Sequence, residues 1–257
     1  MLEWLWRGLR GGRVTTRYPS RAEIPPEPFQ GRVEVLEASG GDPSLATLCP
    51  TGAISVDGDG AVQLDRGLCI LCGECVRGAP DRFRFQAAYE TASRPRAGLL
   101  VGARGHFPNV EPVRADLAPS RALRRSIHIR HVDSGSDGAE EWEIQALLNP
   151  YYDIQRLGFF FTSSPRHADV LLVTGGVTEP MRAPLERVWQ VMPEPKAVVA
   201  VGTDACSGGL SATTGATAGG VDRVLPVDVY VPGSPPSPIA ILDGLLLAVD
   251  ALTGASR

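Results

Sequence analysis

The chain has 257 residues, of which 43% are hydrophobic and 21% are charged, as in an ordinary water-soluble globular protein. This length allows two domains, each with its own buried core. The formal net charge of −4 does not favour nucleic-acid binding, because proteins of that class normally carry a basic stripe. The first residues lack the pattern of a secretory signal peptide, and no uninterrupted apolar run of about 18 to 20 residues predicts a membrane span.

The first 31 residues are predicted to form a short helix followed by an extended strap. Residues 1–9 place leucine and tryptophan side chains on one helical face, and Gly11 ends the helix. We expect this face to dock on a partner subunit or on the chain's own fold, or to lie in the interface of a bilayer. The prolines within residues 24–29 require an extended backbone, because consecutive prolines cannot continue a helix.

Four of the five cysteines show the spacing of iron–sulfur ligands. Cys69, Cys72 and Cys75 form a C-x2-C-x2-C run, and Cys49 stands before Pro50 in an earlier segment. In bacterial ferredoxins, the cysteine of a remote Cys-Pro pair ligates the cluster of the other half-motif. The sequence therefore predicts one [4Fe–4S] cluster on these four cysteines. Cysteines at ligand spacing, rather than in a disulfide framework, also indicate a reducing compartment.

A second cluster is not expected in this part of the chain. Its ligands would stand at four positions that hold no cysteine, namely Ser39, Asp42, Leu45 and Ala79. One complete ligand set is present and the other is absent, which favours a single cluster. Two alternatives stay open: a four-cysteine zinc site, although such sites usually pair two C-x2-C motifs, and unliganded thiols.

Residues 32–92 are predicted to form the single-cluster, ferredoxin-like α+β domain. Within it, residues 53–56 and 61–64 are expected to be short strands of a hairpin, because Asp57-Gly58-Asp59-Gly60 is a strong turn signal. Residues 93–126 are rich in Arg, Pro and Gly and show weak periodicity. They are predicted to be the linker between two domains.

From residue 127 onward, predicted strands alternate with predicted helices. The apolar strands are expected at residues 127–132, 170–174, 197–201 and 224–229, and the helices at 140–148, at 181–192 and from Pro238 onward. Short strands separated by helices predict a parallel sheet that is covered on both faces. We therefore expect residues 127–257 to form a flavodoxin-like α/β domain, with ligands beyond the carboxyl ends of the strands.

The loops of this second domain resemble a known family, the small subunit of energy-converting, group 4 [NiFe] hydrogenases of the formate-hydrogenlyase type, which is related to the 20 kDa subunit of complex I. The motifs that carry the resemblance are Asn149-Pro150-Tyr151-Tyr152-Asp153-Ile154, Ser164-Pro165-Arg166-His167-Ala168-Asp169, Pro226-Val227-Asp228-Val229-Tyr230-Val231-Pro232-Gly233 and Pro235-Pro236. The resemblance covers about residues 127–252. The first domain, including residues 12–19, is similar to the ferredoxin-type subunit of the same complexes, so the chain resembles a fusion of two neighbouring subunits.

This resemblance implies a set of partners and a location. A large hydrogenase-like or complex I-like subunit and integral membrane subunits are the expected partners, with the chain in the cytoplasm and peripheral on the inner face of the cell membrane. A nucleotide is not expected, because the glycine-rich residues 208–209 and 215–220 lack both the Gly-Lys-Ser/Thr ending and the G-x-G-x-x-G pattern of phosphate loops.

The chain departs from the family at the proximal [4Fe–4S] cluster, which the resemblance implies would be held by four cysteines. The corresponding positions here are Asp137, Glu140, Asp204 and Ser234, and Cys206 lies two residues past its expected place. The proximal cluster is therefore predicted to be absent. These oxygen donors could hold Mg²⁺ or Ca²⁺, or side chains, solvent or a partner loop could fill the space. Asp137, Glu140 and Glu141 could also share a proton, although a solvated surface is the simpler interpretation.

These patterns together predict an iron–sulfur electron-transfer subunit of a membrane-associated, multisubunit oxidoreductase, without a catalytic centre of its own. One alternative is a structural or regulatory subunit of a hydrogenase-related complex. A stand-alone redox protein of the ferredoxin type is a third hypothesis.

Overall fold

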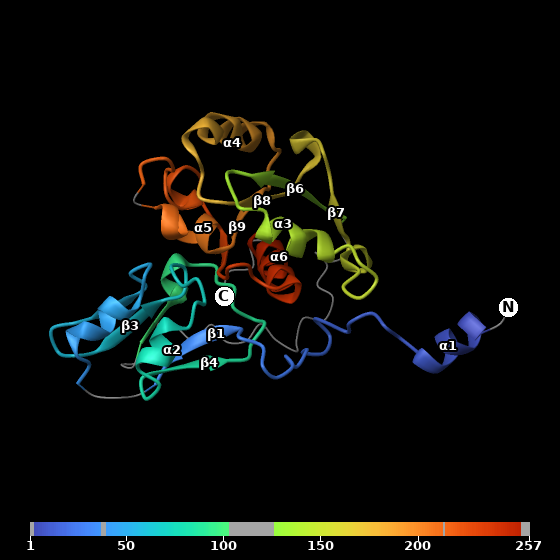
Figure 1. Cartoon of the computed structure of the whole chain (residues 1–257). Coiled ribbons are helices and arrows are strands. Elements are labelled where there is room, and N and C mark those ends of the chain that lie inside the picture. The colour runs from blue at the N-terminus through green and yellow to red at the C-terminus, as the bar shows by residue number, and fades with distance from the viewer. Residues whose placement is uncertain (1–2, 37–39, 103–125, 213, 253–257) are drawn as a thin grey trace.

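The computed structural model describes residues 3–36, 40–102, 126–212 and 214–252. These residues form a mixed α/β fold with antiparallel sheets in the first part and a five-stranded parallel sheet in the second. The predicted fold class, a ferredoxin-like part followed by a flavodoxin-like part, is confirmed. Figure 1 shows the parallel sheet with its helices in the upper half and the antiparallel sheets below it.

The parallel sheet has the strand order β10-β9-β8-β6-β7. Its two inner strands, β8 (Val170–Thr174) and β9 (Ala197–Val201), are buried at every position, which explains why they read as continuous apolar runs. The other strands are β6 (Ile127–Asp133), β7 (Phe159–Phe161) and β10 (Val229–Val231). All neighbouring pairs are parallel, so their carboxyl ends meet at one edge.

Helices cover both faces of this sheet (Figure 1). On one face, α6 (Pro238–Leu252) and α3 (Ala139–Ala146) pack on alternate strand residues such as Leu172. On the other face, α4 (Glu179–Val191) and α5 (Thr203–Ser207) pack on the intervening residues such as Val173. This alternation follows from the two-residue period of a strand.

The first part is built around two small antiparallel sheets. β1 (Arg32–Val35) pairs with β4 (Phe83–Gln86), and β3 (Val62–Asp65) lies between β2 (Ile54–Val56) and β5 (Leu100–Gly102). A five-residue helix, α2 (Glu74–Gly78), packs close to β4. Their buried side chains form a core separate from those of the parallel sheet. The predicted hairpin at residues 53–64 is confirmed.

Short 3₁₀ helices connect several of these elements, at Pro43–Leu48, Arg96–Leu99, Ile154–Leu157, Pro165–His167, Gly209–Ser211 and Val221–Arg223. The N-terminal helix, α1 (Glu3–Gly11), extends away from the rest of the described chain, with Trp6 and Leu9 exposed (Figure 1). No helix among the described residues is long and apolar enough to cross a membrane.

Three details differ from the sequence-based expectation. β7 was not predicted, because three residues are too few to show a period. The strand predicted at residues 224–229 begins only at Val229, since Pro226 has no N–H to donate and the Asp228 carboxylate accepts a hydrogen bond from the Val198 amide. The start of the predicted linker forms β5, which pairs with β3. Most of that linker, residues 103–125, lies outside the described residues.

Candidate metal centre and the neighbouring acidic site

The four predicted cluster cysteines line a single pocket. Cys49 follows a 3₁₀ helix, Cys69 and Cys72 lie in the loop between β3 and α2, and Cys75 lies in the first turn of α2. The remaining lining is mainly apolar, from Val33, Leu48, Ile54, Leu64 and Ile70, together with Thr51 and Gly73. Two segments twenty residues apart in the sequence are thus brought together around one cavity.

The backbone of the loop explains how three thiols reach the same pocket. Leu71 and Gly73 have φ values of 56° and 75°, a left-handed conformation that reverses the chain twice within a few residues. Cys49 is fixed from the other side, since its Sγ accepts a hydrogen bond from the Ala53 amide at 3.2 Å and lies 3.3 Å from the Thr51 hydroxyl.

The buried positions of Cys69 and Cys75 disfavour their thiolate forms. Burial raises the pKa of Cys69 to about 11, a backbone hydrogen bond from Leu71 lowers it in part, and the other three cysteines raise it further. Burial likewise raises the pKa of Cys75. Thiols with raised pKa values stay protonated until a metal cation compensates their charge, so metal binding here would release protons.

The described residues contain no group of three or more His, Cys, Asp or Glu side chains arranged to hold one metal ion. A tetrahedral zinc site with Zn–S bonds of about 2.3 Å needs sulfur atoms roughly 3.8 Å apart. The cysteine pocket offers four thiols around a common cavity.

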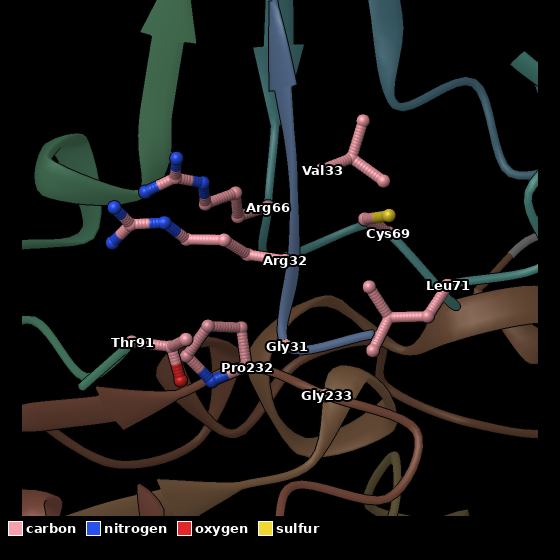
Figure 2. A pocket seen from close by; sticks show the side chains of 9 residues that line it. All are labelled: Gly31, Arg32, Val33, Arg66, Cys69, Leu71, Thr91, Pro232 and Gly233. Carbon is pink, nitrogen blue, oxygen red and sulfur yellow. The ribbon is translucent and has the colours of Figure 1, made fainter. Parts of the chain in front are cut away.

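The cysteine pocket lies against the carboxyl edge of the parallel sheet. The Thr203 hydroxyl, at the start of α5, is 2.9 Å from the Cys69 carbonyl oxygen and 3.2 Å from that of Gly233. Pro232 and Gly233 line a second recess together with Cys69 and Leu71 (Figure 2). The loop that carries the cysteines thus packs directly on the loops that follow β9 and β10.

The segments that follow β6, β9 and β10 carry the four positions where the family resemblance places the proximal-cluster ligands. Asp137 lies just before α3, Glu140 in its first turn, Asp204 in α5 and Ser234 in the loop after β10. Glu140 is only 3% exposed, whereas Asp137 and Ser234 are exposed and Asp204 is half-buried. The parallel sheet therefore brings the carboxylates to one edge, and Ser234 faces solvent.

Glu140 is the unusual residue of this acidic site. Its Oε2 is buried without a hydrogen-bond partner among the described residues. A Cβ at Gly202 would lie 2.4 Å from its Oε1, and Gly202 has a φ of 92°, so only glycine leaves space for this carboxyl. Burial, together with the charges of Asp137, Asp204 and Glu141, raises the pKa of Glu140 to about 7. A hydrogen bond from its own backbone N–H acts in the opposite direction and lowers this pKa in part. Burial and Asp137 also raise the pKa of Asp204.

Glu141 does not join this group by hydrogen bonding. Its two oxygens accept hydrogen bonds from the hydroxyls of Ser136 and Thr174, and one of them lies 3.5 Å from Nε2 of His131. The donors at the family's ligand positions are oxygen atoms without a thiolate, and they do not fit an iron–sulfur cluster. Cys206, buried in α5, places its Sγ 3.8 Å from the Ala200 carbonyl oxygen and lies outside the residues that line the cysteine pocket.

Comparison with known proteins agrees with the second part of the fold. The family model of the NADH ubiquinone oxidoreductase 20 Kd subunit matches residues 138–248. The chain is also 44% identical over 130 residues to the probable membrane-bound hydrogenase subunit mbhJ of Pyrococcus furiosus, a match that covers 51% of this chain and 78% of that relative. The chain belongs to the family of the NADH ubiquinone oxidoreductase 20 Kd subunit. The resemblance inferred from the loop motifs is confirmed.

Two further relatives are each similar to about half of the chain. Formate hydrogenlyase subunit 7 of Escherichia coli K12 is 43% identical over 132 residues, which is 51% of this chain and 52% of that protein, so the chain spans about half the length of this relative. A subunit in the structure of the membrane-bound sulfane sulfur reductase, an archaeal respiratory membrane complex, is 29% identical. The matched region covers 53% of this chain and 75% of that subunit, with a TM-score of 0.47.

Proposed function

We propose that this chain is an electron-transfer subunit of a membrane-associated oxidoreductase and that Cys49, Cys69, Cys72 and Cys75 hold one [4Fe–4S] cluster. The observation that carries the proposal is that these four cysteines, from two separate segments, line one pocket with the ligand spacing of a ferredoxin.

When bound, such a cluster supplies one-electron transfer. The residues of the chain have the supporting roles. The four thiolates bind the iron atoms, and the apolar side chains of Val33, Ile54 and Leu64 restrict water around them. The hydroxyl of Thr203, at the Cys69 carbonyl oxygen, orients the cysteine loop on the α/β part, as hydrogen bonds around ligands commonly do.

The proximal cluster of the family is proposed to be absent from this chain. Asp137, Glu140, Asp204 and Ser234 provide no thiolate, and the buried Glu140 carboxyl packs directly against Gly202. The cysteine pocket is then the only cluster site of the chain, and electrons leave it toward a partner without a second cluster in the α/β part.

The proposed partners follow from the relatives. Formate hydrogenlyase subunit 7 and the Pyrococcus furiosus membrane-bound hydrogenase subunit are named as subunits of larger assemblies. We propose a large hydrogenase-like or complex I-like subunit and integral membrane subunits as partners, with the chain peripheral on the cytoplasmic face of the membrane. We also propose four parts of the chain: a helix and strap (1–31), a cluster domain (32–92), a connection (93–126) and an α/β domain (127–257). The connection includes β5, which joins the sheet of the cluster domain.

A second candidate function is a structural or regulatory subunit of the same kind of complex. The loss of all four thiolates at the acidic site favours it, because a subunit that no longer relays electrons through its α/β part could persist for its docking surfaces. In that case the cluster would stabilise the fold or sense redox state without lying on an electron path.

Anaerobic purification followed by iron and sulfide quantitation and EPR of the reduced protein tests the proposal. We expect about four iron atoms and four sulfides per wild-type chain and a single EPR signal. Cys72→Ser should lose most of both, while Cys206→Ser, which changes the one cysteine outside the pocket, should keep them. Absence of iron from the wild type, or eight iron atoms per chain, would contradict a single cluster.

A further inference from the structure

Arg66 is a largely buried cation beside the cysteine pocket. It stands three residues before Cys69, and its carbonyl oxygen accepts a hydrogen bond from the Cys69 amide at 3.2 Å. Its Nε is buried and has no hydrogen-bond partner among the described residues. Figure 2 shows the guanidinium groups of Arg66 and Arg32 side by side in the recess that Cys69 also lines, with the sulfur of Cys69 pointing away from them.

Asp65, which precedes Arg66 in the sequence, and Glu34, whose charge acts on Arg66, are both paired with other arginines. Asp65 accepts hydrogen bonds from both terminal nitrogens of Arg96, at 2.8 and 2.7 Å. Glu34 is paired with Arg84 at 2.9 Å and with Arg32 at 3.7 Å. Both carboxylates thus have arginine partners other than Arg66, and the arginines that line the recess together with Cys69 are Arg32 and Arg66.

Arg66 keeps its charge in this environment. Burial, and then the neighbouring charge of Arg32, lower its pKa to about 10, which is still well above neutrality. Among the charges that act in the opposite direction are those of Glu34 and Cys69. A largely buried cation acts more strongly on a neighbouring charge than an exposed one, because less water screens it.

The negative charge that the positive charge of Arg66 would attract is that of a cluster bound in the cysteine pocket. Four thiolates make a thiolate-bound cluster anionic, and each electron that it accepts adds negative charge. Net charge and solvent exposure around a cluster are among the factors that set its reduction potential. Arg77 offers a contrast: its guanidinium lies 3.2 Å from the Cys72 carbonyl oxygen, but it is 64% exposed and paired with Glu74.

We propose that Arg66 is a positioning residue that raises the reduction potential of the cluster, through its unpaired charge beside Cys69. The inference rests on the proposed function, since it requires a cluster on the four cysteines. Arg32 contributes in the same direction but less, because Glu34 compensates part of its charge. Arg77 contributes little, because solvent and Glu74 screen it.

The test is an EPR-monitored redox titration of anaerobically purified full-length variants. Arg66→Gln should make reduction roughly tenfold less favourable, a shift of about 59 mV toward more negative potential for a one-electron couple. Arg66→Lys should restore most of the wild-type potential, because it keeps the charge. Arg32→Gln should shift the potential in the same direction by a smaller amount, and the matched control Arg77→Gln should shift it least.

Iron quantitation on each variant separates this inference from the proposed function. If the wild type holds no cluster, the proposed function fails. If Arg66→Gln holds a full cluster at the wild-type potential, or shifts it no more than Arg77→Gln does, the role of Arg66 is refuted while the cluster stands. If Arg66→Gln does not assemble a cluster, the other two variants decide. A negative shift of the potential in Arg32→Gln, together with a near wild-type potential in Arg66→Lys, supports the inference. An unshifted potential in Arg32→Gln overturns it.

Discussion

Replacing Glu140 by glutamine should stabilise the protein at neutral and alkaline pH. The carboxyl is 3% exposed, and its raised pKa of about 7, against an ordinary value of 4.5, means that the folded state holds a proton that the unfolded state loses. Each pKa unit corresponds to roughly 1.4 kcal/mol. The ionised carboxyl therefore costs the folded state about 3 kcal/mol.

The direction of the pH dependence follows from proton binding. Below about pH 4.5, Glu140 is protonated in both states and contributes nothing. Between about pH 4.5 and 7, only the folded state keeps the proton, so stability falls as the pH rises. Above pH 7 the loss is complete. Glutamine has nearly the same shape and no charge, so Glu140→Gln should match the wild type at pH 4.5 and gain up to about 3 kcal/mol at pH 8.

Urea denaturation followed by circular dichroism at pH 5, 6, 7 and 8 measures this effect. Glu141→Gln is the matched control, because Glu141 already accepts hydrogen bonds from Ser136 and Thr174 and its replacement should not stabilise the protein at any of these pH values. A Glu140→Gln variant that is less stable than the wild type at pH 8 would refute the reasoning. That result would mean that the carboxylate is charged and compensated in the folded protein, for instance by a bound cation.

Two further predictions concern contacts around the two sites. Gly202→Ala should lower the free energy of unfolding, measured by urea denaturation, by about 2 kcal/mol or more. The reason is that a Cβ meets the Glu140 carboxyl at 2.4 Å and that φ of Gly202 is 92°. The same substitution in a Glu140→Ala background should avoid the clash but keep the backbone strain. Asp65→Asn should cost about 2 kcal/mol, since it removes the carboxylate that binds Arg96 through two hydrogen bonds. The control Asp81→Asn, at a salt bridge whose carboxylate is 78% exposed, should cost less than about 1 kcal/mol, and equal losses in the two variants would contradict a special role for Asp65.

Much of the architecture was predictable because local pattern and tertiary environment agree. β8 and β9 are central strands buried on both faces, and such strands must read as apolar runs. The cysteine spacing is also local information for three of the four thiols, because Cys69, Cys72 and Cys75 share one loop and one helical turn. The acidic residues could be placed at one sheet edge from topology alone, since they follow the carboxyl ends of parallel strands.

The remaining features depend on contacts between segments far apart in the sequence. No local signal shows that Thr203 reaches the Cys69 carbonyl oxygen. Likewise, no local signal shows that Arg66 has no carboxylate partner within the described part of the chain, because the neighbouring Asp65 carboxylate is paired with Arg96. Glu140 was expected in a solvated group, and its burial arises only when α3 packs its first turn against Gly202.

The cysteine pocket and the acidic site are separated by the residues Thr203 and Gly233. The charge of each site therefore influences the ionisation of the other. Thr203 and Gly233 lie beside Asp204 and Ser234 in the sequence, yet both approach the Cys69 loop. A thiolate-bound cluster is anionic, so ionised carboxylates beyond these two residues would oppose its reduction. A protonated Glu140 removes one such charge, and the positive charge of Arg66 acts in the same direction. Both groups would therefore favour the uptake of an electron by the proposed cluster.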